Sequence, residues 1–372
     1  MIARILTEKV RADLNRGKVL VVFGARQVGK TTLMNALSDD GLKTLRLNCD
    51  DRDDRADLTD KSSTQLQQLL SGYDRVCIDE AQRVPDIGLT LKKIGDLHLR
   101  TQILVTGSSA LDLADRINEP ATGRLIEYRM FPLSLRELAE HSSEREEQRL
   151  LGQRLIYGLY PEIVTTPEDA RRLLSLLANN YLYKDLLAYK GIKKPDLIEK
   201  LVRALALQIG EEVSYNELAQ LLGVDKETVE NYISLLEKCF VIFRLESYSR
   251  NLRNEIKKGK KIYFWDNGIR NAVLSNFAPL DSRNDVGALW ENLMVSERAK
   301  RNAYLQNFAH LYFWRTHDQK EIDLLEEVDG GLCAFEFKSK AGKKVSSPKQ
   351  FSDTYQEATF EVITPDNYWS FV

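Results

Sequence analysis

Residues 19–32 read VLVVFGARQVGKTT, and this stretch decides the fold of the first part of the chain. Val19–Phe23 is short, apolar and β-branched, which predicts a buried strand, and Lys30–Ser38 predicts a helix. Between them lies a complete GxxxxGK(S/T) loop, the motif that holds phosphates between a strand and a helix. We therefore expect an α/β domain whose nucleotide-binding residues are Gly24, Ala25, Arg26, Gln27, Val28, Gly29, Lys30, Thr31 and Thr32.

The chemistry of this loop gives each of its polar residues a role. Gly24 and Gly29 let the backbone fold tightly, so that N–H groups at a helix N-terminus face the phosphates. Lys30 would reach the β- and γ-phosphate oxygens as a catalytic group, and the Thr31 hydroxyl would hold Mg²⁺. ATP and Mg²⁺ are therefore the expected cofactors.

A second motif, Arg75–Glu80 (RVCIDE), is an apolar strand that ends in two carboxylates. Asp79 would bind Mg²⁺ directly or through water, and Glu80 would act as general base on the attacking water. A further strand, Thr44–Leu47, lies between the two motifs in the sequence, as expected of a P-loop protein built for hydrolysis. The alternative is that Glu80 only caps a helix.

Polar residues end the next strand, where Val105–Ser109 reads VTGSS. Ser108 is the candidate to orient the lytic water, with Thr106 close behind, and a plain turn is the alternative. Arg124 precedes the expected strand Leu125–Tyr128. Its place after the polar strand end makes it a candidate arginine finger that acts across a subunit boundary, although a lone arginine is more often a surface residue.

Five motifs of the chain resemble those of a group of prokaryotic AAA+-like ATPases that carry a C-terminal domain of unknown function. The motifs are GARQVGKTT, VCIDEAQRVPD, LVTGSSA, TGRLIEYRMFPLS and YGLYPEIV, and the resemblance covers nearly all of the chain. It implies a P-loop ATPase of the AAA+/ASCE kind that works as a homo-oligomer, with a hexameric ring as one form. The resemblance supplies no settled substrate.

The order of the expected elements divides the chain into three domains. Residues 1–140 alternate strands and amphipathic helices, the pattern of a parallel sheet covered by helices, and would be the AAA+-type P-loop ATPase domain. Residues 141–285 are a helical lid or linker followed by a winged-helix domain. Residues 286–372 would form a nuclease-like α/β domain. The expected fold class is therefore α/β, with a helical and winged-helix middle.

The middle part predicts a helix-turn-helix. Ser214 and Glu217 form a capping box, Gly223 makes the turn, and Asp225 begins a second helix. That helix starts DKETVEN, and its acids would face phosphates if it lay in a DNA major groove, which opposes the usual docking. Contact with a protein partner is the stronger alternative for these helices.

A basic run follows from Arg244 to Lys261, with seven basic residues against two acids. A basic hairpin with Gly259 at its tip would be a plausible wing that contacts a nucleic-acid backbone. Simple solvation of the charges is the alternative. The candidate nucleic-acid contacts are Arg250, Arg253, Lys257, Lys258, Lys260 and Lys261.

The C-terminal part carries the core of the PD-(D/E)XK nuclease pattern. Asp323 lies on one expected strand and Glu336 on the next, so both carboxylates could bind one divalent cation. Lys338 falls on the same strand face as Glu336. A preceding helix supplies Glu291 or Glu297, of which Glu291 fits the pattern better. The proline that usually precedes the first strand acid is missing, which places active cleavage in question.

Composition sets further bounds. The 372 residues carry 53 Lys and Arg against 55 Asp and Glu, so any nucleic-acid contact must rest on a local patch. No apolar run is long enough for a membrane span, and the first residues do not read as a signal peptide. Four widely spaced cysteines fit a reducing compartment. These features predict a cytoplasmic protein without a membrane partner.

The sequence thus predicts an ATP-hydrolysing motor that remodels branched or single-stranded DNA. Two other functions stay open. One is an ATP-gated, metal-dependent DNA endonuclease, and the other is a signalling ATPase whose nucleotide state controls a protein partner.

Overall fold

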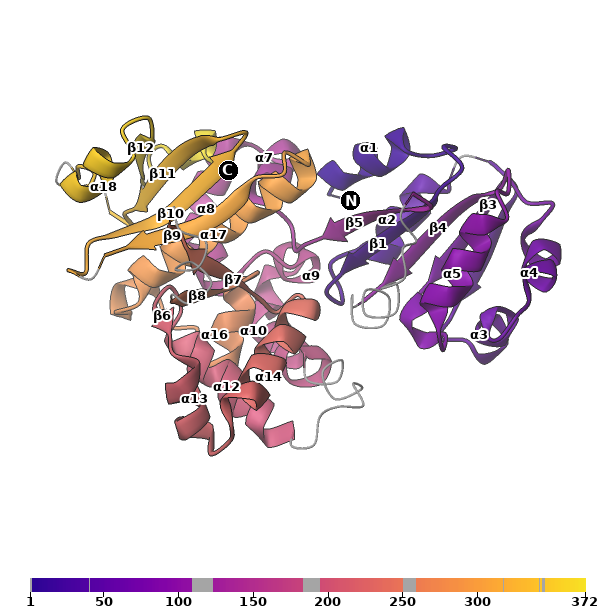
Figure 1. Ribbon diagram of the computed structural model, residues 1–372, viewed down its shortest axis with the longest axis horizontal. Coiled ribbons are helices and arrows are strands. Elements are labelled where there is room, and N and C mark those ends of the chain that lie inside the picture. The colour runs from indigo at the N-terminus through magenta and orange to yellow at the C-terminus, as the bar shows by residue number, and fades with distance from the viewer. Residues whose placement is uncertain are drawn as a thin grey trace. The chain divides into compact units, whose positions relative to one another are not determined.

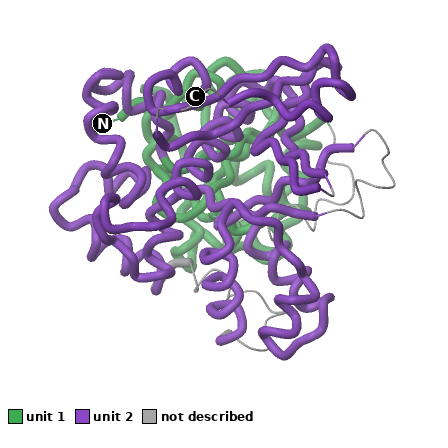
Figure 2. The backbone as a smooth tube through the Cα atoms, turned by 90° about the vertical axis from the view of Figure 1, so that its left-hand side faces the viewer, with its two compact units in different colours: residues 1–132, 238–240 green, residues 133–237, 241–372 purple. Residues whose placement is uncertain are grey.

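The computed structural model describes residues 2–39, 41–108, 123–182, 195–249, 259–316, 318–340, 342 and 345–372. The chain divides into two compact units, which Figure 2 colours separately. Unit 1 comprises Met1–Pro132 with Lys238–Phe240, and unit 2 comprises Leu133–Glu237 with Val241–Val372. The expected boundary at residue 140 lies near the first division, whereas the boundary at residue 285 stays a prediction.

Unit 1 is built on a parallel five-stranded sheet with the order β2-β3-β4-β1-β5 (Figure 1). All residues of β1 and β4 are buried, as expected of central parallel strands covered on both faces. The strand β4 lies between β1 and β3, so the strand ends that carry the two sequence motifs flank it. The strands are β1 (Val19–Gly24), β2 (Thr44–Asn48), β3 (Arg75–Asp79), β4 (Gln102–Gly107) and β5 (Leu125–Met130).

In unit 1 the helices α3 and α4 begin at side-chain caps, and α2 begins at the end of the phosphate loop. The helix α2 packs against β1 and β4, and α5 packs against β1. Ser62 and Gln65 cap α4 with a reciprocal capping box. The helices are α1 (Ile5–Ala12), α2 (Lys30–Leu37), α3 (Arg52–Leu58), α4 (Ser63–Leu70), the 3-10 helix η1 (Ala81–Arg83) and α5 (Ile87–Asp96).

Unit 2 begins with helices that continue into the expected helix-turn-helix. The helix α10 ends at Leu176, a π-helical segment η3 follows it directly, and residues 183–194 lie outside the described part of the chain. The helices are α7 (Leu135–His141), α8 (Glu144–Tyr157), α9 (Pro161–Thr165), η2 (Pro167–Asp169), α10 (Ala170–Leu176), η3 (Leu177–Leu182), α12 (Pro195–Leu207), α13 (Tyr215–Leu222), α14 (Lys226–Lys238), α16 (Asn267–Val273), η4 (Leu280–Ser282), α17 (Val286–Leu305), α18 (Lys349–Thr354) and η5 (Tyr368–Ser370).

The sheet of unit 2 has seven strands in the order β12-β11-β10-β9-β7-β8-β6. It is mixed, because β7 pairs with β9 and β11 with β12 in parallel, whereas the other pairs are antiparallel. This sheet joins strands from both sides of residue 285. The strands are β6 (Glu212–Val213), β7 (Ile242–Ser247), β8 (Lys260–Phe264), β9 (His310–Arg315), β10 (Glu321–Val328), β11 (Gly331–Phe337) and β12 (Thr359–Ile363).

Two separate sets of side chains cover the strands of unit 2. Trp314, Ile322 and Leu325 form a core with Phe351 of α18 and Tyr355. The 20-residue helix α17 packs against β8 and β11. Because side chains alternate along a strand, Phe313 and Arg315 point to the face opposite Trp314. On β9 the aromatic core therefore lies on one face of the strand, and Arg315 points to the other face.

Candidate functional site

The phosphate-binding loop joins the end of β1 to the start of α2. Gln27 and Gly29 both have left-handed backbones, with φ of 61° and 100°, which turn the chain sharply before the helix. Lys30 is 5% exposed, and its Nζ donates hydrogen bonds to the carbonyl oxygens of Gly24 at 3.0 Å and Ala25 at 2.7 Å. The ammonium is therefore held inside the curl of the loop, where a phosphate would need it.

Gly24 is required by the close approach of β5. A Cβ at this position would lie 2.1 Å from the carbonyl oxygen of Met130. Arg4, which sequence analysis did not single out, supports the same region from outside: its Nη1 donates to the Val28 carbonyl at 2.6 Å and its Nη2 donates to the Phe131 carbonyl at 2.7 Å. No local spacing marks Arg4 for this role.

Asp79 lies at the end of β3 beside the helix that follows the loop. The Thr31 hydroxyl donates to Asp79 Oδ2 at 2.7 Å, and the Thr106 hydroxyl from β4 donates to the other carboxylate oxygen. The two residues expected to hold Mg²⁺ are therefore adjacent, and both offer the oxygen ligands that this hard cation prefers. Their arrangement fits the expected cation.

Glu80 directly follows Asp79 and has a left-handed backbone, with φ of 52°. Its carboxylate accepts a hydrogen bond from the side-chain amide of Gln82. The same amide bonds Ser108 at the end of β4, which is 3% exposed. The structure therefore brings Glu80 and Ser108 together, and it adds Gln82, which belongs to the VCIDEAQRVPD motif although sequence analysis gave it no role.

Arg124 lies at the amino ends of the strands, opposite the carboxyl ends where the phosphate loop lies. Its carbonyl accepts from the N–H of Val19, the first residue of β1, whereas the phosphate loop follows the last residue of that strand. Six strand residues span roughly 20 Å, so Arg124 does not reach the nucleotide site of its own chain. Its guanidinium is half-buried and forms an ion pair with Asp96 of α5.

The four nuclease candidates come together in unit 2. The β10–β11 register pairs Leu324 with Phe335 and so brings Asp323 beside Glu336. Lys338 Nζ lies 2.7 Å from Glu336 Oε1. Burial, together with the charges of Glu291 and Glu336, raises the pKa of Asp323 to about 8. Asp323 therefore lies close to both glutamates.

Lys261 is a correction to the expected nucleic-acid contacts. It lies on β8 and is 1% exposed, and its Nζ pairs with Glu291 at 3.3 Å and with Glu321. Tyr263 also donates to Glu291, at 2.6 Å. Because β8 is covered on both faces, this ammonium points away from any surface ligand and into an acidic cluster formed by Glu291, Glu321, Asp323 and Glu336. Within the described ranges, no group of three His, Cys, Asp or Glu side chains has the arrangement of a metal site.

The other members of the basic run divide between two groups. Lys260 is half-buried, with its Nζ 5.0 Å from the centre of the Tyr215 ring. Arg250, Arg253, Lys257 and Lys258 lie outside the described residues, as does Ser109.

Glu297 is the second helix acid that the nuclease pattern offered, and its side chain is buried. Its Oε1 lies 2.7 Å from Lys300 Nζ, and its other carboxylate oxygen accepts a hydrogen bond from the N–H of Leu135. Its position is that of a structural ion pair.

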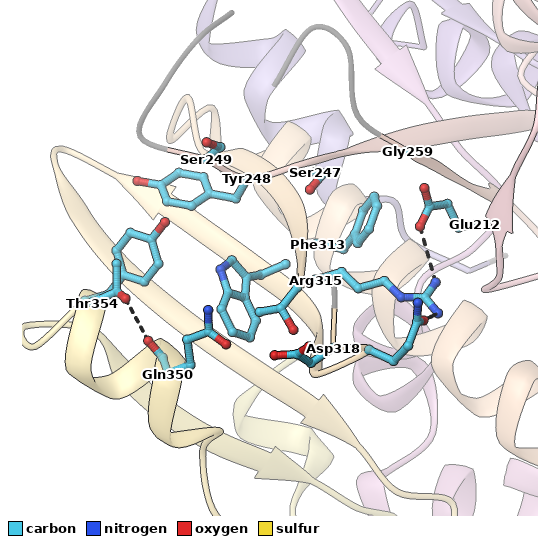
Figure 3. Close-up of a pocket in the computed structure, with 14 residues that line it drawn as sticks. Glu212, Ser247, Tyr248, Ser249, Gly259, Phe313, Arg315, Asp318, Gln350 and Thr354 are labelled. Carbon is cyan, nitrogen blue, oxygen red and sulfur yellow. Dashed lines mark hydrogen bonds and ion pairs between the residues drawn. The ribbon is translucent and has the colours of Figure 1, made fainter. Parts of the chain in front are cut away.

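Unit 2 also contains a cavity of about 580 Å³ at the carboxyl ends of β7 and β9. Figure 3 shows Arg315 reaching across it toward Glu212, whose carboxylate lies 3.3 Å from the guanidinium. Ser249 and Gly259, the described residues that flank the basic segment, both line this cavity. The remaining lining residues are Ser247, Tyr248, Phe313, Trp314, Thr316, Asp318, Gln319, Gln350, Thr354 and Tyr355.

Three family models match successive parts of the chain. Residues 16–139 match the AAA domain, residues 148–280 match a domain of unknown function (DUF8612), and residues 286–366 match another domain of unknown function (DUF4143). The solved structure of a Walker-type ATPase from Pyrococcus abyssi is similar, with a TM-score of 0.50 and 15% identity, over 74% of this chain and 96% of that one. The first part of the chain is therefore a P-loop ATPase domain of the AAA-like kind.

The curated relatives carry no described activity. An uncharacterized protein of Mycobacterium tuberculosis is 28% identical over 344 residues, which cover 91% of this chain and 74% of the relative. An uncharacterized protein of Haemophilus influenzae is 24% identical, with 82% of this chain and 79% of the relative covered. Among the described residues, no helix is both long and apolar enough to cross a membrane.

Proposed function

Because the chain carries an AAA-like ATPase domain, we propose that it is an ATP-hydrolysing motor that remodels branched or single-stranded DNA. The observation that supports hydrolysis best is the meeting of three strand ends. Lys30 and Thr31 follow β1, Thr106 and Ser108 belong to the end of β4, and Asp79 ends β3. Such a cluster at the carboxyl ends of parallel strands is where α/β proteins bind ligands.

In this proposal each residue has one task. Lys30 binds the β- and γ-phosphate oxygens, and Thr31 and Asp79 hold Mg²⁺, which neutralises charge on the phosphates when bound. Glu80 accepts a proton from the attacking water, and Ser108 orients that water. The hydrogen bonds link Thr31 to Asp79, and they link Glu80 to Ser108 through Gln82. Lys30 is held by the carbonyl groups of the phosphate loop.

A second subunit completes the proposed site. Arg124 lies about one strand length from the phosphate loop of its own chain, so it would act on the nucleotide of a neighbour. The expected oligomer is a closed ring, of which a hexamer is one form. Arg124 would have to exchange its ion pair with Asp96 for the neighbour's phosphates.

The support for DNA as the partner comes from the basic segment and the cavity. Residues 250–258 carry four of the candidate cations, and the chain enters and leaves this segment at Ser249 and Gly259, on the rim of the cavity. Proteins that bind single-stranded nucleic acid usually combine cationic side chains, which contact its phosphate backbone, with aromatic side chains on which its bases stack. The two helices α13 and α14, followed by the β7–β8 hairpin, are interpreted as the winged helix that would carry this segment.

The test is ATP hydrolysis measured with and without forked, junction and single-stranded DNA at roughly 50 mM salt, where phosphate contacts are strongest. We expect at least one of these DNAs to raise the turnover rate, and Lys30→Ala to abolish hydrolysis with every DNA. If none of them binds or stimulates the wild-type protein, the motor function is refuted.

The acidic cluster favours one alternative, a metal-dependent endonuclease. Asp323, Glu336 and Lys338 have the strand positions that such an enzyme needs, but Lys261 already balances part of the acidic charge. Cleavage would therefore require a cation to compete with a buried ammonium. Cutting of DNA that depends on Mg²⁺ or Mn²⁺, is lost in Glu336→Ala and persists in Lys30→Ala would favour this function over the motor.

A further inference from the structure

The side chain of Gln82 connects two parts of the ATPase site that come from different strands. Its Nε2 donates to the carboxylate of Glu80 and to Ser108 Oγ, the latter at 2.9 Å. Its Oε1 accepts from the backbone N–H of Ser108 at 3.1 Å. One amide therefore spans the gap between the residue after β3 and the end of β4.

The partners fix which end of the amide faces which residue. A backbone N–H can only donate, so the atom that faces Ser108 N must be the carbonyl oxygen of the amide. The NH₂ group must then point toward Glu80. The bond to Glu80 is thus a donor-to-carboxylate bond, the stronger, charge-assisted kind.

The backbone explains why Gln82 can reach both partners. Glu80 has a left-handed conformation and is followed at once by the 3-10 helix Ala81–Arg83. This tight turn folds Gln82 back over Glu80, whereas a regular helix would carry it away. A left-handed backbone at a residue with a side chain is uncommon and costs free energy, and such residues cluster at functional sites.

We propose that Gln82 is a positioning residue that fixes the Glu80 carboxylate against Ser108, so that the general base and the end of β4 act as one unit. This inference rests on the proposed ATP hydrolysis. The Gln82 bond engages Glu80 Oε2, and the other carboxylate oxygen then faces the water that is to be deprotonated. Without the amide, the glutamate side chain gains rotational freedom and points at the water for only part of the time.

The expected effect is on turnover rather than on ATP binding. A misplacement of about 1 Å at a reacting group can reduce a rate 100-fold, so we expect Gln82→Ala to lower kcat by roughly 10- to 100-fold. The KM for ATP should change by less than about 3-fold, since Gln82 contacts neither the phosphate loop nor Asp79 in the bonds described. Gln82→Glu keeps the shape and the acceptor for Ser108 N but loses the donor, so it should lower kcat by a similar factor.

A matched control lies in the same turn. Arg83 is exposed, and its Nε lies 3.0 Å from Asp50, so Arg83→Ala should leave kcat within about 2-fold of wild type. The decisive comparison is the double variant Gln82→Ala with Glu80→Gln. If Gln82 acts through Glu80, its removal should not reduce the residual rate of Glu80→Gln any further.

Three results would overturn this role. The first is an unchanged kcat in both Gln82→Ala and Gln82→Glu. The second is a full additional loss of rate in the double variant, which would indicate a structural role independent of Glu80. The third is a wild-type protein without ATP hydrolysis, and that result alone would also remove the proposed ATPase activity. Binding of a fluorescent ATP analogue to each variant reports whether the site has folded.

Discussion

Replacing Gly24 by alanine should lower the unfolding free energy of unit 1, because the added Cβ would overlap with the neighbouring strand. The added Cβ would lie 2.1 Å from the Met130 carbonyl oxygen and 3.2 Å from Val28 Cγ2. The first of these atoms belongs to the backbone of β5, which pairs with β1 at this position. It cannot rotate away as a flexible side chain would.

The magnitude follows from this overlap. A carbon normally stays about 3.3 Å or more from a carbonyl oxygen, so β1 and β5 must separate locally by roughly 1 Å. Loss of the last bond of the ladder costs about 1 kcal/mol, and strain from overpacking adds about 1–3 kcal/mol. We expect unit 1 to lose about 2–4 kcal/mol of unfolding free energy in Gly24→Ala.

Urea unfolding followed by far-ultraviolet circular dichroism measures this loss. All four tryptophans, Trp265, Trp290, Trp314 and Trp369, belong to unit 2, so tryptophan fluorescence should be unchanged and distinguishes the two units. Gly17→Ala is the control, because Gly17 also has a positive φ, of 69°, but no atom within 4 Å of an added Cβ. That variant should lose only about 1 kcal/mol. Equal losses in the two variants, with normal ATP binding in Gly24→Ala, would refute the reasoning.

Local patterns in the sequence predicted the elements of the ATPase site well. The apolar runs of β1 and β3 are each followed by their motif, and the expected strands Val19–Phe23 and Thr44–Leu47 match β1 and β2 to within one residue. The adjacency of Thr31 and Asp79 follows from the rule that parallel strand ends meet at one edge of a sheet. Such features depend on neighbours in the chain or on a general rule of topology.

Contacts between distant residues could not be predicted in this way. Arg4 bonds carbonyl groups that lie 24 and 127 residues away, and no periodicity signals such a pair. Lys261 was expected on a basic surface because its neighbours in sequence are basic. The structure buries it because β8 lies between β7 and β6 in the sheet, and β6 lies more than 40 residues earlier in the chain.

Three further predictions test the charged groups. Burial alone would raise the pKa of Asp285, but bonds from Arg283 and Arg270 outweigh it and lower the pKa to about 2, so Asp285→Asn should cost about 2 kcal/mol of unfolding free energy at pH 7. Stabilisation by a lowered pKa is complete above the unfolded value of 3.8 and is lost as the pH falls to the folded value of about 2. The difference in unfolding free energy should therefore shrink as urea unfolding is repeated from pH 4 down to 2. Lys261→Met should lower the melting temperature without changing the salt dependence of DNA binding. Lys260→Met should leave the unfolding free energy within about 0.5 kcal/mol of wild type. An unchanged melting temperature in Lys261→Met, together with a weaker salt dependence of DNA binding, would place Lys261 at the surface. Arg124→Ala should bind ATP normally but hydrolyse it roughly 10³-fold more slowly in the assembled oligomer, and wild-type turnover in this variant would exclude it as an arginine finger.

The measurement closest to the central claim is strand separation on a forked DNA that carries a fluorophore and a quencher at its paired end. The proposed motor predicts that fluorescence rises only when ATP and Mg²⁺ are present, and that Lys30→Ala and Glu80→Gln give no signal although Glu80→Gln still binds ATP. A wild-type protein that hydrolyses ATP at the same rate with and without the fork, and leaves the strands paired, would contradict the claim.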